Sequence, residues 1–285
     1  MNQLHQEAVI RLGFFGAVLT LMALWEFWAP RRRLSVNKPT RWANNLCLVF
    51  LNAVTARLLF PLGAVGVAMI AESHGWGLFN NLDLPLGFAV VLAVIALDFA
   101  IYLQHVLFHA VPVLWRLHMV HHGDLDVDVS TGLRFHTLEI VLSAGIKAAA
   151  VVLLGAPAMA VLAFEVLLNA TSMFNHANVR LPGWLDRVLR LVIVTPDMHR
   201  VHHSTKSLET NSNFGFNLPW WDFLLGTYRA QPAGGHANMS LGLADCRDER
   251  IDRLPWMLGL PFFGKVGKAP AFPSRARQEA GEPRA

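Results

Sequence analysis

The stretch LEIVLSAGIKAAAVVLLGAPAMAVLAFEVLLNA, residues 138–170, decides how this chain can fold. A tract this apolar is typical of a membrane-inserted segment, and Gly155-Ala156-Pro157 interrupts it. Two histidine-rich pentapeptides flank it, HMVHH at 118–122 and HRVHH at 199–203. A single crossing would leave these pentapeptides on opposite membrane faces. Because Gly and Pro favour a turn, we expect a helical hairpin, re-entrant or spanning, that returns both pentapeptides to one face.

The composition agrees with a membrane protein. Hydrophobic residues make up 54% of the chain and charged residues only 15%, and the mean hydropathy is +0.38. Three further segments, 8–29, 43–71 and 85–104, carry only isolated charges. Each is long enough to cross a hydrocarbon core of about 30 Å at about 1.5 Å per residue. The sequence therefore predicts an all-α integral membrane protein with three spanning helices plus the hairpin.

The basic residues indicate the orientation. They gather between the first two predicted spans, at Arg31, Arg32, Arg33, Lys38 and Arg41. Cytoplasmic loops are rich in Lys and Arg, so we expect this loop, and with it both pentapeptides, on the cytoplasmic side. This placement accounts for the net charge of +4 without a nucleic-acid partner, since no soluble basic face interleaved with aromatic residues is visible.

Three parts of the chain are predicted. Residues 1–84 form N-terminal membrane helices with their loops, and the first helix is expected to stay as an anchor. Residues 85–245 form a histidine-rich domain of membrane helices with a cytoplasmic cap. Residues 246–285 form a tail, and its end, rich in Pro, Ala and charge, is expected to be disordered.

Histidine clustering is the chemical signal. Ten of the 13 histidines lie between residues 105 and 203. In H-x-x-x-H, and in H-x-x-H-H if helical, imidazoles one turn apart can bind one metal ion, while the additional histidine turns toward a second. Two such groups plus one histidine from another helix could bind two ions. The candidate ligands are His105, His109, His118, His121, His122, His176, His199, His202 and His203.

Three other polar residues have alternative roles. His136 could bind metal, or it could hydrogen-bond Glu139 or a substrate. Asp98 and Asp197 could orient imidazoles by accepting an N–H, or they could be ordinary helix-polar or capping residues. Imidazole suits iron, zinc, copper and nickel, so the ligands alone do not select the metal.

Two metal-site classes are excluded by their patterns. Met119 and Arg200 stand where the H-E-x-x-H motif of zinc proteases requires Glu. The Glu-x-x-His pairs of carboxylate-bridged di-iron bundles are absent from these groups. The two cysteines, Cys47 and Cys246, predict neither a disulfide framework nor a cysteine metal site.

In this order, HVLFH (105–109), HMVHH and TPDMHRVHHS (195–204) resemble the three histidine boxes of the fatty acid hydroxylase and sterol desaturase superfamily. The resemblance extends to LRFHTLE, FNHANVRLPGWLD and NSNFGFNLPWWDFLLGTY and covers roughly residues 85–229. The branch that includes alkylglycerol monooxygenase is the most similar. Gln104 and Val106 depart from residues common in the family, aromatic and Arg respectively.

The resemblance implies a centre of two iron ions that activates O2 to hydroxylate or desaturate a lipid C–H bond of a fatty acyl, sterol-like or ether lipid. Electrons would come from a separate donor, a ferredoxin or a cytochrome b5-type protein with its reductase. The ligands would lie in the three boxes, with His176 as the ninth, and no catalytic residue is expected beyond the metal centre. The alternative is a non-catalytic metal-binding or metal-transport protein, although histidines gathered at helix ends differ from a pathway spaced through a bilayer.

Overall fold

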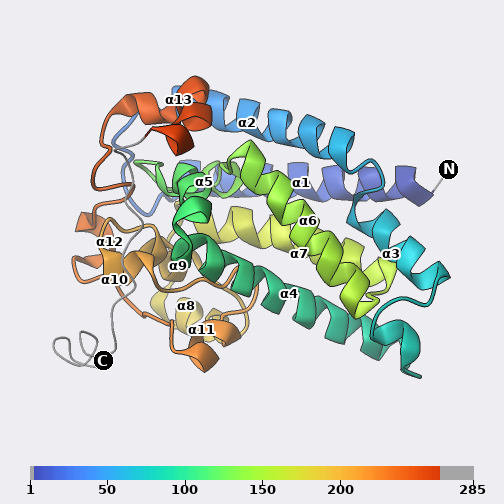
Figure 1. The fold of residues 1–285 in the computed structure, drawn as a ribbon. Helices are drawn as coiled ribbons and strands as arrows, with labels where there is room; N and C mark the ends of the chain where they lie inside the picture. Colours follow the sequence, from blue (N-terminus) through green and yellow to red (C-terminus); the bar gives the residue numbers. More distant parts are fainter. Residues whose placement is uncertain (1–2, 264–285) are drawn as a thin grey trace.

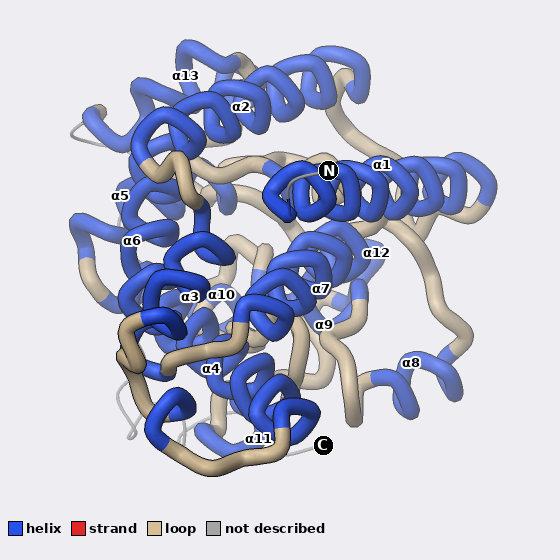
Figure 2. The backbone as a smooth tube through the Cα atoms, turned by 90° about the vertical axis from the view of Figure 1, so that its right-hand side faces the viewer, coloured by secondary structure: helices blue, strands red, loops and turns tan. Residues whose placement is uncertain are grey.

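The computed structural model describes residues 3–263, and within this range it contains helices and loops but no β-strand (Figure 2). The all-α prediction is confirmed. The helices are α1 (Gln3–Trp28), α2 (Lys38–Leu59), α3 (Gly63–Ser73), α4 (Leu86–Ala110), α5 (Pro112–His122), α6 (Thr137–Leu154), α7 (Ala158–His176), α8 (Gly183–Leu189), α9 (Pro196–His202), α10 (Ser207–Thr210), α11 (Trp220–Leu225), α12 (Gly235–Asn238) and α13 (Leu254–Gly259), with 3-10 turns at Phe79–Asn81, Thr131–Leu133, Glu249–Asp252 and Leu260–Phe262.

Five stretches are long and apolar enough to cross a membrane. They are Gln6–Trp28, Lys38–Ser73, Leu86–Ala110, Thr137–Leu154 and Ala158–His176. They correspond to the three predicted spans and the two arms of the predicted hairpin. Long helices α1, α2, α4, α6 and α7 lie roughly along one direction. The short helices α5 and α8–α13 gather at one end of them, and α3 lies toward the other end (Figure 1).

One predicted span divides in two. Residues 43–71 were expected to form a single helix, but α2 ends at Leu59 and α3 begins at Gly63. Pro61 has no N–H to donate to a continuing helix, and Gly63 adopts a φ of +61° that a side chain would disfavour. The 22 residues of α2 extend about 33 Å and are long enough to cross alone.

The turn between α6 and α7 confirms the predicted reversal. Gly155 ends α6 in the left-handed conformation, φ 62°, and its N–H bonds to Val151 and Val152. Gly77 packs so closely here that a Cβ on it would lie 2.1 Å from the Gly155 nitrogen. The arms contain 18 and 19 residues. The two arms, α6 and α7, diverge, and α3 and α4 each pack against both arms.

The two ends of the hairpin return to the same end of the molecule (Figure 1). The first residue of α6, Thr137, and the last residue of α7, His176, both lie beside the short helices. These short helices, α5 and α8–α13 with their loops, form what we call the cap. The segment with α13 packs on α2 and α5, and the predicted disordered end of the chain falls on residues 264–285, outside the described residues.

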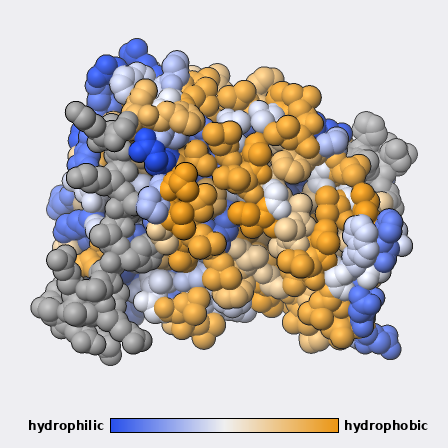
Figure 3. Space-filling view, in the orientation of Figure 1, coloured by the Kyte–Doolittle hydropathy of each residue, from blue (hydrophilic) through white to orange (hydrophobic). Residues whose placement is uncertain are grey.

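The surface of the long helices is apolar. Phe27, Leu58 and Leu153 are 77%, 75% and 74% exposed. Figure 3 shows this surface as a broad hydrophobic area, with hydrophilic residues gathered toward the two ends. Such a surface is what a lipid environment requires. The length and composition of these helices, together with their apolar surface, are therefore those of a multi-pass membrane protein.

Candidate metal centre

Nine buried histidines meet where the cap covers the long helices. They come from α4, α5, α7, and from α9 with the residue that follows it. They form two groups, and within each group one ring nitrogen per residue lies within 4.8 Å of all the others. The five-histidine group comprises His105, His109, His118, His122 and His202, and the four-histidine group comprises His121, His176, His199 and His203.

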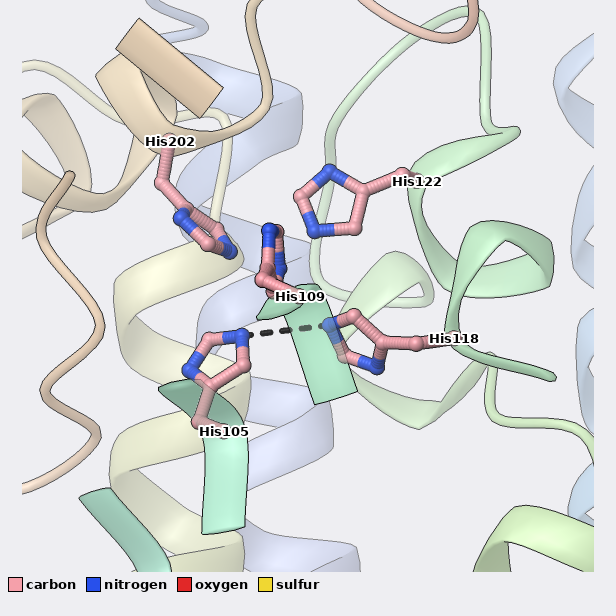
Figure 4. Close-up of side chains that lie close together, drawn as sticks. All are labelled: His105, His109, His118, His122 and His202. Carbon is pink, nitrogen blue, oxygen red and sulfur yellow. Dashed lines mark hydrogen bonds between the residues drawn. The ribbon is translucent and has the colours of Figure 1, made fainter. Parts of the chain in front are cut away.

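Helical spacing divides the pentapeptides between the two groups. On α5, His118 and His122 are one turn apart and face the five-histidine group, while His121 turns to the other. In the second pentapeptide the division is reversed, since only His202 joins the five-histidine group. Figure 4 shows the rings of that group pointing toward one another from α4, α5 and α9. The structure thus brings together all nine histidines that the sequence singled out as ligands.

Hydrogen bonds fix the orientation of five of the rings. In each, the outer nitrogen Nδ1 faces an oxygen that only accepts, so Nδ1 carries the proton and Nε2 keeps a free lone pair. Four of the acceptors are backbone carbonyl oxygens: Phe214 for His105 (2.7 Å), Ser212 for His202 (2.8 Å), Ser172 for His176 (2.7 Å) and Arg134 for His121 (3.3 Å). The fifth acceptor is the side-chain carboxylate of Glu139, 2.6 Å from Nδ1 of His118.

The inner nitrogens have the spacing of ligands that share an ion. Nε2 of His105 lies 3.1 Å from Nε2 of His118, a contact dashed in Figure 4. In the other group, His176 Nε2 lies 3.1 Å from His121 and 3.0 Å from His199. Two lone pairs that face each other repel, and a cation between them removes the repulsion. Metal–nitrogen bonds are about 2.1 Å, so ligands at right angles are about 3 Å apart.

Buried ring nitrogens without a hydrogen-bond partner also indicate that each group binds a metal ion. Nε2 of His122, of His202 and of His203 is buried without a hydrogen-bond partner. A buried polar atom left unpaired is costly, and metal coordination is a partner that all of them can reach within their groups. The residues present therefore fit two metal ions.

The six candidate ligands on α5 and at α9, outside the spanning helices, are neutral. Burial lowers the pKa of His118 to about 3, because an imidazolium would lose its hydration. Burial, together with neighbouring imidazoles, also lowers the pKa of the other five far below its ordinary value; these are His121, His122, His199, His202 and His203. Neutral imidazole is the form that binds metal.

Three predicted residues lie outside both groups. His136 is the N-cap of α6, where its Nδ1 accepts from the Leu138 N–H, and its Nε2 contacts the Leu258 carbonyl. Asp98 accepts from the Trp221 indole at 2.8 Å. Asp197 pairs with Arg31 and Arg200.

Their expected roles belong to other residues. Asp98 contacts the cap instead of a ligand ring, and Glu139, considered from the sequence only as a partner of His136, orients His118. One signal could have identified Glu139. A carboxylate at the start of an apolar helix is costly unless it has a buried partner, and His118 is that partner.

A buried ion network holds the loop after α5. Arg41, fully buried, donates to Asp124 at 2.7 Å and to Asp128 at 2.9 Å. Arg41 comes from the start of α2, so the pairing joins this helix to the loop that follows His122. Burial alone would raise the pKa of Asp124, but the guanidinium groups of Arg41 and Arg134 outweigh it and hold this pKa below its usual value.

Residues 90–227, which contain all nine histidines, match the family model described as fatty acid hydroxylase. Through this segment, slightly less than half of the chain, the protein is similar to the fatty acid hydroxylase family. The superfamily to which the sequence was assigned by resemblance is confirmed. No solved structure matches the chain.

Curated relatives within this family are lipid-modifying enzymes by name. The chain is 36% identical to ornithine lipid hydroxylase OlsE of Rhizobium tropici over 176 residues, which cover 61% of this chain and 51% of that protein. It is 29% identical to alkylglycerol monooxygenase of Homo sapiens over 49% of this chain and 30% of that protein. The Danio rerio alkylglycerol monooxygenase is 28% identical over 63% and 40% respectively. The chain thus spans about half, or less, of the length of these relatives.

Proposed function

We propose that this protein is a membrane-bound, non-haem di-iron oxidoreductase that uses O2 and electrons from a separate donor to hydroxylate a C–H bond of a polar membrane lipid. The observation that carries the proposal is the pair of buried histidine groups, five and four residues, at the end of apolar helices long enough to span a bilayer. Iron bound in such groups supplies the activation of O2.

The chain's own residues contribute geometry and the exclusion of water. Peptide carbonyls and Glu139 hold five rings by Nδ1, which leaves each Nε2 available to bind an ion within its histidine group. The nine ligands are at most 3% exposed, and the cap covers them. A dry, preoriented site limits side reactions of the activated oxidant with water.

The basic residues support a cytoplasmic cap. Arg31, Arg32 and Arg33 follow α1 at the cap end, whereas the loop between α3 and α4, residues 74–85, has no Lys or Arg. Under the positive-inside rule the cap then faces the cytoplasm. A soluble ferredoxin, or a cytochrome b5-type protein with its reductase, could deliver electrons from that side.

The relatives' names support a lipid with a polar headgroup. One relative is an ornithine lipid hydroxylase and others are alkylglycerol monooxygenases. We place ornithine lipids first as candidate substrates because the identity is greatest there among these three, and alkylglycerols second.

Reconstitution tests the proposal. The purified protein, loaded with Fe²⁺ in vesicles that contain ornithine lipid or alkylglycerol, is supplied with NAD(P)H and a reductase–ferredoxin pair. We expect O2-dependent NAD(P)H consumption and a product one oxygen atom heavier than the lipid. A product lighter by two hydrogens would indicate desaturation instead. Full iron occupancy with no lipid-dependent O2 uptake, across both lipids and a cytochrome b5 donor, would favour a structural metal site.

A further inference from the structure

Asp222 lies behind the ring of His105. Its carboxylate is fully buried and accepts hydrogen bonds from two successive peptide N–H groups, Phe214 at 2.8 Å and Gly215 at 2.9 Å. The carbonyl of Phe214 in turn accepts the Nδ1 proton of His105 at 2.7 Å. One carboxylate therefore fixes the peptide that orients a ring of the five-histidine group.

A hydrogen-bond chain ties this carboxylate to the helix that carries His105. Because a carboxylate only accepts, Thr227 donates its hydroxyl proton to Asp222, at 2.6 Å. Tyr102 must then donate to Thr227, at 2.8 Å. Tyr102 lies three residues before His105 on α4. A Cβ at Gly215 would lie 2.9 Å from the Asp222 carboxylate, so the glycine permits this close approach.

Asp252 has the same relation to the four-histidine group. Its carboxylate binds the guanidinium of Arg134 at 2.6 Å. The same guanidinium donates to the carbonyls of Val120 at 2.9 Å and Ile251 at 2.6 Å, all in the buried interior. The carbonyl of Arg134 faces Nδ1 of His121 at 3.3 Å. Asp252 thus fixes the residue that orients His121.

We propose that Asp222 and Asp252 are positioning residues for different metal ions. Asp222 sets the His105 ring and hence the ion of the five-histidine group, whereas Asp252 sets the His121 ring and hence the ion of the four-histidine group. The proposal rests on the metal-binding part of the proposed function, and not on the lipid reaction.

The test uses the full chain in lipid nanodiscs with two matched variants, Asp222→Asn and Asp252→Asn. Asparagine keeps the volume of aspartate. In Asp222→Asn, the side-chain NH₂ must face one of the former hydrogen-bond donors. In Asp252→Asn, Arg134 loses its carboxylate partner at 2.6 Å and keeps only the more distant Asp124, at 3.9 Å. Residues that orient ligands typically contribute about 10–100-fold to metal affinity. We expect Asp222→Asn to lower the affinity of the five-histidine group for its ion by about this factor and to leave the affinity of the four-histidine group unchanged. We expect Asp252→Asn to have the reverse effect.

The readout is the affinity of each ion in a titration with ⁵⁷Fe²⁺ followed by Mössbauer spectroscopy. His109→Ala and His203→Ala, each of which removes a ligand from one group, assign the two signals. Thermal unfolding of the metal-free protein reports structural damage separately. No turnover is measured, so a failure of the lipid reaction leaves this test valid.

Loss of both ions in equal proportion in either variant, or unchanged affinities in both, would overturn the proposal. If Asp222→Asn does not fold, Thr227→Val serves in its place, because it keeps the carboxylate and removes the hydroxyl that donates to Asp222 and accepts from Tyr102. Thr227→Val should lower the metal affinity of the five-histidine group by a smaller factor. An effect of Thr227→Val on the four-histidine ion would equally contradict the assignment.

Discussion

The long helices and the cap bury opposite kinds of side chain. Among the long helices the buried residues include small apolar ones such as Ala93 and Ala160, and several large apolar side chains, such as Phe27 and Leu153, face outward. In the cap the buried side chains include imidazoles and carboxylates such as Asp124, which pairs with Arg41 of α2. This difference indicates which end of the molecule carries the function. Substitutions in the cap should change metal chemistry, whereas substitutions at the far end of the helices should change stability alone.

The largest effect should come from a ligand. His109→Ala removes a fully buried member of the five-histidine group. Even a residue that only orients a ligand contributes about 10–100-fold to metal affinity, so product formation should fall by more than about 100-fold. Lipid mass spectrometry and iron content measure the loss. His74→Ala is the control, because His74 is exposed in the loop after α3 at the far end. Comparable loss in both variants would refute the division between the histidine-bearing end of the molecule and the far end of the helices.

A smaller effect should follow from the carboxylate behind His118. Glu139→Leu removes the 2.6 Å acceptor of the His118 Nδ1 proton, whereas Glu139→Gln keeps an oxygen that can accept it. We expect the Leu variant to bind iron about 10–100-fold more weakly and the Gln variant to stay within a few-fold of the parent. Iron titration of the purified proteins distinguishes them. Equal affinities in the two variants would show that this hydrogen bond does not orient the ring.

The sequence predicts the long helices well because their signal is local. Apolar runs set the spans, Gly155 and Pro157 set the turn, and the three boxes identify eight of the nine histidines, all but His176. The break at Pro61 was missed because hydropathy stays high across it, and only the backbone requirements of Pro61 and Gly63 divide the segment.

The contacts around the ligands could not be predicted in this way, because each joins segments distant in the chain. His105 and Phe214 are 109 residues apart, and Asp98 and Trp221 are 123 apart. A peptide carbonyl carries no residue-specific signal, so nothing in the sequence marks Phe214 as an acceptor. Asp98 fits the stripe of His105 and His109 on α4, yet its partner is supplied by the cap.

The smallest effect should arise at the turn farthest from the metal. Gly155→Ala places a side chain at φ 62° and 2.7 Å from the Trp76 carbonyl. The left-handed conformation costs a non-glycine residue about 1–2 kcal/mol, so the free energy of unfolding should fall by at least that amount while iron content stays unchanged. Gly145→Ala is the matched control, since its added Cβ meets nothing within 4 Å and lies inside α6. It should be neutral or stabilising by up to about 1 kcal/mol. Loss of iron in Gly155→Ala at unchanged stability would show that the turn and the metal centre are coupled, against the separation argued above.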